Sequence, residues 1–190
     1  MKLSATLFSL GLITLLATSS FAAHVYSGID LRSGKDVSIV RDDLSVPNGA
    51  DKMGTVLIFM SAKCPCSMSH AEEVQKLSAD YPEYRFIGVN SNAEESIEMA
   101  GKYFSSFPFP VLKDEKTILA EEFKAVKTPH AFILNKDGAK LFQGGVSSSS
   151  TFARADHKYL REALEDLKAG RAVRTPLARA LGCSIERPSK

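Results

Sequence analysis

Residues 55–67 have the sequence TVLIFMSAKCPCS, in which an apolar run leads directly into two cysteines. Thr55–Met60 form the continuous apolar run, a pattern typical of a central strand buried on both faces. The apolar side chains that follow have helical spacing, which predicts a helix over residues 67–79. Cys64 is therefore expected where a buried strand ends and a helix begins, among backbone N–H groups without helical partners. Such a position favours the thiolate over the thiol, and the thiolate is the form that attacks sulfur or binds a metal.

The rest of the chain predicts an α/β domain with a mixed central sheet. Strands are expected at residues 25–31, 35–40, 55–60, 85–90, 111–112, 130–135 and 140–143, and helices at residues 67–79, 94–104, 117–123 and 156–169. The alternation of strands and helices in the first part of this order is typical of an α/β fold. The Asp137-Gly138 turn predicts a hairpin between the strands at residues 130–135 and 140–143. Residues 41–52 are expected to form a loop, and the last 20 residues have only weak helical character.

The first 22 residues have the pattern of a cleaved signal peptide. Lys2 precedes the apolar stretch Leu7–Ala17, which is too short to span a bilayer, and small residues end the segment at Ala22. We therefore expect an exported protein of the bacterial periplasm. No integral membrane segment is expected once residues 1–22 are removed.

The remainder of the chain has the size of a single domain. We divide it into a domain over residues 23–170 and a C-terminal tail over residues 171–190 that carries Cys183. The formal net charge is only +2, so nucleic acid is not expected as an obligate partner. The three cysteines are too few to staple a small disulfide-rich fold, and their odd number leaves at least one thiol unpaired or cycling.

Cys64 is the candidate nucleophile, and the roles of the other two cysteines stay open. Cys66 either resolves a mixed disulfide or a sulfenate on Cys64, or is a passive helix residue. A bridge between these two closes a small, strained ring, so it should be easily reduced. Cys183 is a resolving thiol, a structural partner or a free thiol.

Several segments resemble the thioredoxin superfamily. Phe59–Ser67 is similar to its active-site segment, and Thr128-Pro129 supports that alignment. Residues 109–114, 128–138 and 182–185 are similar to secreted redoxins of the alkyl hydroperoxide reductase and thiol-specific antioxidant branch, which is peroxiredoxin-like.

This resemblance implies a thioredoxin-like fold: a mixed central sheet flanked by helices, with an N-terminal strand pair and a C-terminal tail. It also implies a cis peptide bond at Thr128-Pro129, which would expose the backbone of Thr128 as an edge for a substrate chain beside the sulfur. The implied activity is that of an exported thiol oxidoreductase that uses Cys64. Its substrate would be a disulfide-bearing protein or a peroxide, and an external thiol would reduce it again.

The chain departs from both patterns that the resemblance suggests. In a thioredoxin-type Cys-x-x-Cys motif the second cysteine would stand at position 67, which is Ser67, so Cys66 lies one residue early. A peroxiredoxin would have Pro at position 57 and Thr or Ser at position 61, and this chain has Leu57 and Ser61. Ser61 retains the hydroxyl that would hydrogen-bond a peroxide. Thiol–disulfide exchange and peroxide reduction therefore stay open as alternatives.

Two further hypotheses compete with a redox enzyme that needs no cofactor. Cys64, Cys66, Met68 and His70 occupy every second position, and thiolate, thioether and imidazole together suit Cu(I). The chain is then a periplasmic Cu(I) carrier. Alternatively, it is a non-catalytic binding module built on a thioredoxin fold.

Overall fold

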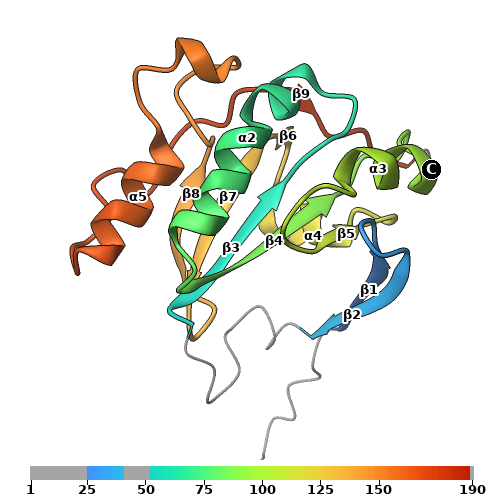
Figure 1. The fold of residues 1–190 in the computed structure, drawn as a ribbon, viewed down its shortest axis with the longest axis horizontal. Coiled ribbons are helices and arrows are strands. Elements are labelled where there is room, and N and C mark those ends of the chain that lie inside the picture. The colour runs from blue at the N-terminus through green and yellow to red at the C-terminus, as the bar shows by residue number, and fades with distance from the viewer. Residues whose placement is uncertain (1–24, 41–51, 189–190) are drawn as a thin grey trace, which may run out of the picture.

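A computed structural model describes residues 25–40 and 52–188 of the chain. The predicted signal peptide and almost all of the predicted loop over residues 41–52 lie outside these residues. The described residues form a seven-stranded sheet in the order β2-β1-β5-β4-β3-β7-β8, and a second sheet of two short strands, β6 and β9 (Figure 1).

The strands are β1 (Val25–Asp30), β2 (Lys35–Val40), β3 (Gly54–Phe59), β4 (Tyr84–Asn90), β5 (Val111–Lys113), β6 (Lys127–Thr128), β7 (His130–Asn135), β8 (Lys140–Gly144) and β9 (Cys183–Ser184). The helices are α2 (Pro65–Asp80), α3 (Ile97–Phe104), α4 (Ile118–Phe123) and α5 (Tyr159–Lys168), with one 3₁₀ turn at Phe152–Arg154. Strands β3, β4 and β5 are parallel, and the other neighbours in the large sheet pair antiparallel. The sheet is therefore mixed, as predicted.

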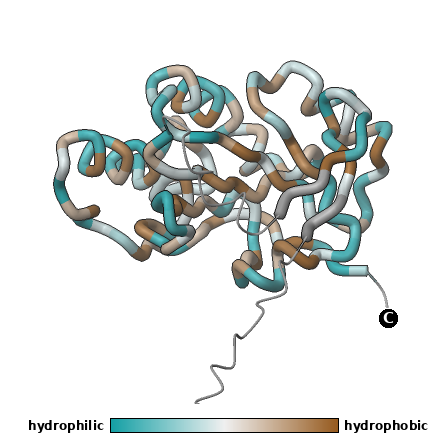
Figure 2. Tube along the Cα trace, turned by 90° about the horizontal axis from the view of Figure 1, so that it is seen from below, coloured by the Kyte–Doolittle hydropathy of each residue, from teal (hydrophilic) through white to brown (hydrophobic). Residues whose placement is uncertain are grey.

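Strand β3 is buried on both faces because its side chains alternate between two apolar clusters. Val56 and Ile58 belong to the cluster that includes residues of α2, α3 and α5. Leu57 and Phe59 belong to the cluster that includes residues of α4. In Figure 1, α2 and α5 lie in front of the sheet and α4 lies behind it. Figure 2 shows the hydrophobic segments concentrated in the middle of the molecule.

The structure confirms the predicted elements with small shifts at their ends. The helix expected over residues 94–104 begins only at Ile97, because the Ser96 side chain caps it by accepting a hydrogen bond of 3.2 Å from the Met99 N–H. The helix expected over residues 156–169 is α5, which ends before Gly170 at a positive φ of 70°.

The C-terminal tail, for which the sequence has only weak helical character, contains a strand that was not predicted. Residues 171–188 form no helix, and Cys183–Ser184 instead pair as strand β9 with β6. A two-residue strand leaves no periodic pattern in the sequence, so it escapes sequence analysis. Within residues 25–40 and 52–188, no helix combines the length and the apolar character needed to cross a membrane.

Candidate active site

Cys64 lies at the N-cap position of α2, directly after the loop that leaves the end of β3. Pro65 occupies the first turn of the helix, where its missing N–H has no helical partner to lose. The Cys64 side chain is only 2% exposed. Its sulfur contacts the Thr128 carbonyl oxygen at 3.2 Å, and its backbone N–H donates to the Ser61 hydroxyl at 3.0 Å. The predicted nucleophile is thus held from both sides.

The Thr128-Pro129 peptide bond is cis, as the resemblance implied. The edge that this loop presents is occupied by the chain itself. Thr128 pairs with Cys183 in the antiparallel β6–β9 ladder, which lies beside the N-terminal end of α2 in Figure 1. A substrate strand therefore does not fit at this edge while β9 is in place.

The tail approaches the loop so closely that only glycine fits before Cys183. A Cβ atom at Gly182 would lie 2.8 Å from the Thr128 carbonyl carbon, which is closer than real Cβ contacts. Further along, the Ile185 N–H donates to the Val126 carbonyl at 3.1 Å. The Ile185 side chain is 4% exposed in the cluster that covers the α4 face of the sheet. These contacts fix the position of Cys183.

The three cysteines converge although one of them is far away in sequence. The sulfur atoms of Cys64, Cys66 and Cys183 all lie within 4.8 Å of one another. All three are free thiols, Cys64 buried and the other two partly buried. Either neighbour is therefore close enough to form a disulfide with Cys64 after a small movement.

The thiolate is concentrated on one of these three sulfurs. Burial opposes ionisation of Cys64, but hydrogen bonds from Cys183, from Thr128 and from the Ser67 and Cys183 backbone outweigh it and lower its pKa to about 7. The Thr128 hydroxyl is buried with no other hydrogen-bond partner. Burial, together with the neighbouring Cys64, raises the pKa of Cys183 to about 12 and also raises the pKa of Cys66. The low pKa keeps Cys64 the candidate nucleophile, and the raised pKa keeps the Cys183 thiol protonated beside it.

A buried carboxylate supports the loop that carries Cys64. Glu95 is 1% exposed and accepts hydrogen bonds from the Ser61 hydroxyl and from the Ala62 N–H at 2.8 Å. Side-chain amides of Asn90 and Asn92 donate to it at 2.7 and 2.9 Å. Burial opposes ionisation of Glu95, but these donors outweigh it and lower its pKa. Ser61 in turn accepts the Cys64 N–H, so the carboxylate holds the cysteine through one intermediate side chain.

Lys113 closes this network from the end of β5. It is 4% exposed, and burial lowers its pKa. Its ammonium group donates to the Asn90 side-chain oxygen at 2.9 Å and to the backbone oxygens of Asn92 and Glu95 at 2.7 and 2.8 Å. Sequence analysis missed Glu95, Asn92 and Lys113, because single polar residues after strands leave no motif. A buried strand that ends in Asn90 was the only available signal.

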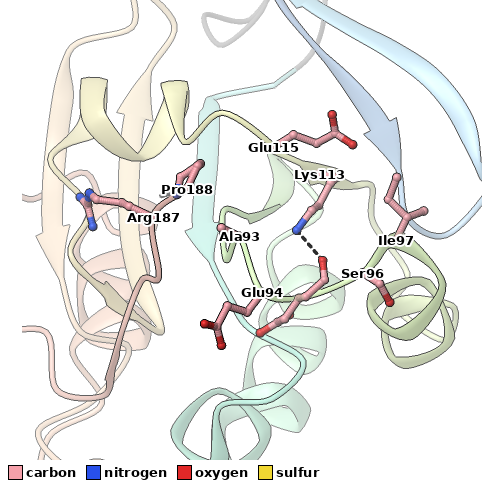
Figure 3. A pocket seen from close by; sticks show the side chains of 9 residues that line it. Ala93, Glu94, Ser96, Ile97, Lys113, Glu115, Arg187 and Pro188 are labelled. Atoms are coloured by element: carbon pink, nitrogen blue, oxygen red, sulfur yellow. Dashed lines mark hydrogen bonds between the residues drawn. The ribbon is translucent and has the colours of Figure 1, made fainter. Parts of the chain in front are cut away.

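Two cavities flank this network. The smaller, about 200 Å³, is lined by Ser61, Cys64, Glu94 and Cys183 among others and opens next to the sulfurs. The larger, about 580 Å³, lies on the other side of Glu94. Figure 3 shows Lys113 among the side chains that line the larger cavity, with a dashed line from its ammonium group to a backbone oxygen, which is that of Glu95. That cavity contains no cysteine.

The structure does not assemble every residue that the sequence grouped together. Met68 is 52% exposed. Both ring nitrogens of His70 are engaged, Nδ1 with the Cys66 backbone oxygen and Nε2 with the Ser147 hydroxyl, each at 2.7 Å. Cys183 stands with Cys64 and Cys66 where Met68 and His70 were expected. Ser61 is fully buried, and its hydroxyl donates a hydrogen bond to the Glu95 carboxylate.

The comparison with known proteins agrees with this architecture. Residues 54–139 match the family model of thioredoxin-like proteins, and they include both Cys64 and the cis-proline loop. The chain has a thioredoxin-like fold. The fold implied by the resemblance is therefore confirmed. No curated protein sequence matches this chain.

Solved structures share the fold of this chain over more residues than the matched segment. An uncharacterized conserved protein from Geobacillus kaustophilus is 28% identical, with a TM-score of 0.73 over 88% of this chain and 92% of its own. A hypothetical protein from Sinorhizobium meliloti is 22% identical, with a TM-score of 0.73 over 88% of this chain and 93% of its own. A secreted disulfide oxidoreductase from Mycobacterium tuberculosis is 18% identical, with a TM-score of 0.50 over 60% of this chain and 79% of its own.

Proposed function

We propose that the chain is a thiol–disulfide oxidoreductase whose redox pair is Cys64 and Cys183. The observation that carries the proposal is the β6–β9 pairing, which holds the Cys183 sulfur within 4.8 Å of the Cys64 sulfur beside the cis-proline loop. The lowered pKa of Cys64 supports its role as the attacking thiolate. A secreted disulfide oxidoreductase shares the fold.

The lowered pKa of Cys64 makes it the first attacking thiol, and the position of Cys183 makes it the second. The Cys64 thiolate attacks one sulfur of a substrate disulfide, forms a mixed disulfide and releases the other sulfur as a thiolate. For a protein substrate, which enters only while β9 is displaced, β9 then pairs with β6 again; Cys183 loses its proton to the released thiolate, attacks the Cys64 sulfur and releases the second substrate thiolate. The substrate is reduced by two electrons, and the protein is left with a Cys64–Cys183 disulfide. An external thiol reductant restores both thiols by the reverse exchange.

The burial of the site favours peroxide reduction as a second candidate function, in line with the resemblance to antioxidant redoxins. Cys64 is 2% exposed, and the cavity beside it is only about 200 Å³. A peroxide fits such a space, whereas a disulfide-bearing protein requires strand β9 to leave Thr128. Attack by Cys64 on the peroxide gives a sulfenic acid and releases an alcohol or water. Cys183 then attacks the sulfenic sulfur and releases water, which forms the same disulfide.

We further propose that the protein works in the periplasm after export. This rests on the signal-peptide pattern of residues 1–22. An oxidising compartment also suits a thiol pair that cycles through a disulfide. The external reductant is then itself an exported thiol protein or a small thiol.

The proposal is tested by trapping free thiols after treating the reduced protein with sub-stoichiometric oxidised glutathione or, in parallel, hydrogen peroxide. Peptide mapping should find a Cys64–Cys183 disulfide with either oxidant. Cys64→Ser should abolish turnover, and Cys183→Ala should accumulate the mixed disulfide or the sulfenate. Cys66→Ser serves as the matched control and should still form the disulfide. Full turnover by the Cys64→Ser protein would overturn the proposal, and no oxidation product at all would favour the non-catalytic binding module.

A further inference from the structure

The three thiols form a ligand set of one chemical kind. Cys64 comes from the N-cap of α2, Cys66 from its first turn and Cys183 from β9. Their sulfur atoms all lie within 4.8 Å of one another. A metal bound by three thiolates in a plane, with metal–sulfur bonds of about 2.3 Å, places its ligands about 4 Å apart. The sulfurs therefore need to move by less than about 1 Å to surround an ion.

The chemistry of this set selects the ion. Among the described residues, no histidine, aspartate or glutamate joins the three cysteines in this group. Thiolates are soft ligands and favour Cu(I) over hard cations. Structural zinc sites take four protein ligands, one more than this group offers. Cu(I) is satisfied by three.

We propose that the reduced protein binds one Cu(I) ion through Cys64, Cys66 and Cys183. Each thiol that binds releases its proton to solvent, and copper enters and leaves as Cu(I), so no electron is transferred. The ligand set differs from the one suggested by the spacing of Cys64, Cys66, Met68 and His70. Met68 points its side chain to the surface, and both nitrogens of His70 are engaged by other groups.

Two lysines bond backbone oxygens close to the site, and a helix N-terminus faces it. Lys63 precedes the first ligand, and its ammonium group contacts the Glu94 backbone oxygen at 2.9 Å. Lys127 reaches the Gly182 carbonyl, next to the last ligand, at 3.2 Å. The positive end of α2 points at Cys64. Burial of Cys64 keeps water away from one side of the site.

The copper site rests on the position of the sulfurs and not on the proposed redox function. A Cys64–Cys183 disulfide removes two of the three ligands, so the disulfide and the copper complex are alternative states of one site. Variants of Cys66 distinguish the copper site from the proposed redox function. It is a ligand in the copper complex and has no part in the Cys64–Cys183 disulfide.

The test is titration of the reduced full chain with Cu(I) in competition with a chromophoric Cu(I) chelator, with X-ray absorption to count the sulfur ligands. We expect one Cu(I) per chain with three sulfur neighbours. Cys64→Ser, Cys66→Ser and Cys183→Ser should each weaken binding by more than about 100-fold, the upper end of what the loss of an outer-shell partner costs. Met68→Leu is the matched control and should bind as the parent does. The disulfide form should not bind.

Each other outcome contradicts the proposal in its own way. Failure to retain Cu(I) against the chelator removes the site. If the Cys66→Ser protein binds Cu(I) as tightly as the parent, the site is a two-coordinate complex of Cys64 and Cys183. If Met68→Leu weakens Cu(I) binding, the ligands are those suggested by the spacing in the sequence. Circular dichroism of each variant confirms that the fold is intact. If Cu(I) binds but no Cys64–Cys183 disulfide ever forms, only the proposed redox function fails.

Discussion

Two regions bring thiols to the same point by different physical means. The loop from Ser61 to Cys64 is held by a buried polar network centred on Glu95, most of it within a few residues of the ends of β3 and β4. The tail that carries Cys183 is held by a two-residue strand, by the buried Ile185 and by a close backbone approach at Gly182. We therefore expect the first region to be the more rigid of the two and the second to be the more easily detached.

The two regions are also joined. The Asn92 side chain donates to Ser61 at 3.2 Å in the cysteine loop and accepts the Glu186 N–H at 2.6 Å in the tail. The Ala93 N–H adds a bond of 2.9 Å to the Glu186 carbonyl. The segment after β4 therefore aligns both thiols at once. Variants that disturb one region at a time test whether each region positions its own thiol.

The largest effect is expected from Glu95→Gln, which should destabilise the polar network that holds the rigid region. The amide places a donor where only donors converge, and it removes one of the negative charges that act on the buried ammonium of Lys113. Each buried donor that loses its acceptor costs about 1–3 kcal/mol, so urea denaturation should show a loss of about 3 kcal/mol or more. The exposed neighbour Glu94 offers the control, since Glu94→Gln should change stability by less than about 0.5 kcal/mol. Equal stability of the two variants would show that the network does not hold the loop.

A smaller effect is expected from Gly182→Ala, which should disrupt the β6–β9 pairing in the detachable region. The new methyl group would meet the Thr128 carbonyl carbon at 2.8 Å, and backbone atoms there cannot move aside. Strand β9 should leave β6 while the main sheet stays folded. Disulfide formation between Cys64 and Cys183 should then slow by roughly 10- to 100-fold, because the two thiols lose the proximity that makes their reaction intramolecular.

Stopped-flow oxidation followed by thiol trapping measures this rate. Ser184→Ala, in the same strand, removes an exposed side chain and keeps the backbone pairing, so it should react at the parental rate. If Gly182→Ala reacted as fast as Ser184→Ala, the pairing would not be what positions Cys183.

The same difference explains what the sequence could predict. The strand and helix around Cys64 follow from local patterns, and so do the nucleophile and most of the seven-stranded sheet. The position of Cys183 depends on a two-residue ladder between distant segments, and Glu95 and Lys113 meet only after β4 and β5 pair. Long-range pairing of this kind leaves no periodicity in the chain. The sequence therefore predicts a candidate attacking thiol, Cys64, but leaves its partner open.

The smallest effect is expected on the ionisation of Cys64 when Cys183 is changed. Among the groups that lower the pKa of Cys64 to about 7 against the opposing effect of burial, the Cys183 thiol comes first. Only the thiolate reacts with iodoacetamide, so the parental alkylation rate should rise with pH through about 7 and level off above it. In Cys183→Ala the midpoint should move upward towards the ordinary value of 9.0, which lowers the reactive fraction at pH 7. Cys183→Ser keeps a hydroxyl donor and should keep the low midpoint. The midpoint, unlike the absolute rate, does not depend on how far the smaller side chain opens the site. An unchanged midpoint in Cys183→Ala would assign the activation of Cys64 to α2 and Thr128 alone, and the tail would then supply only the resolving thiol.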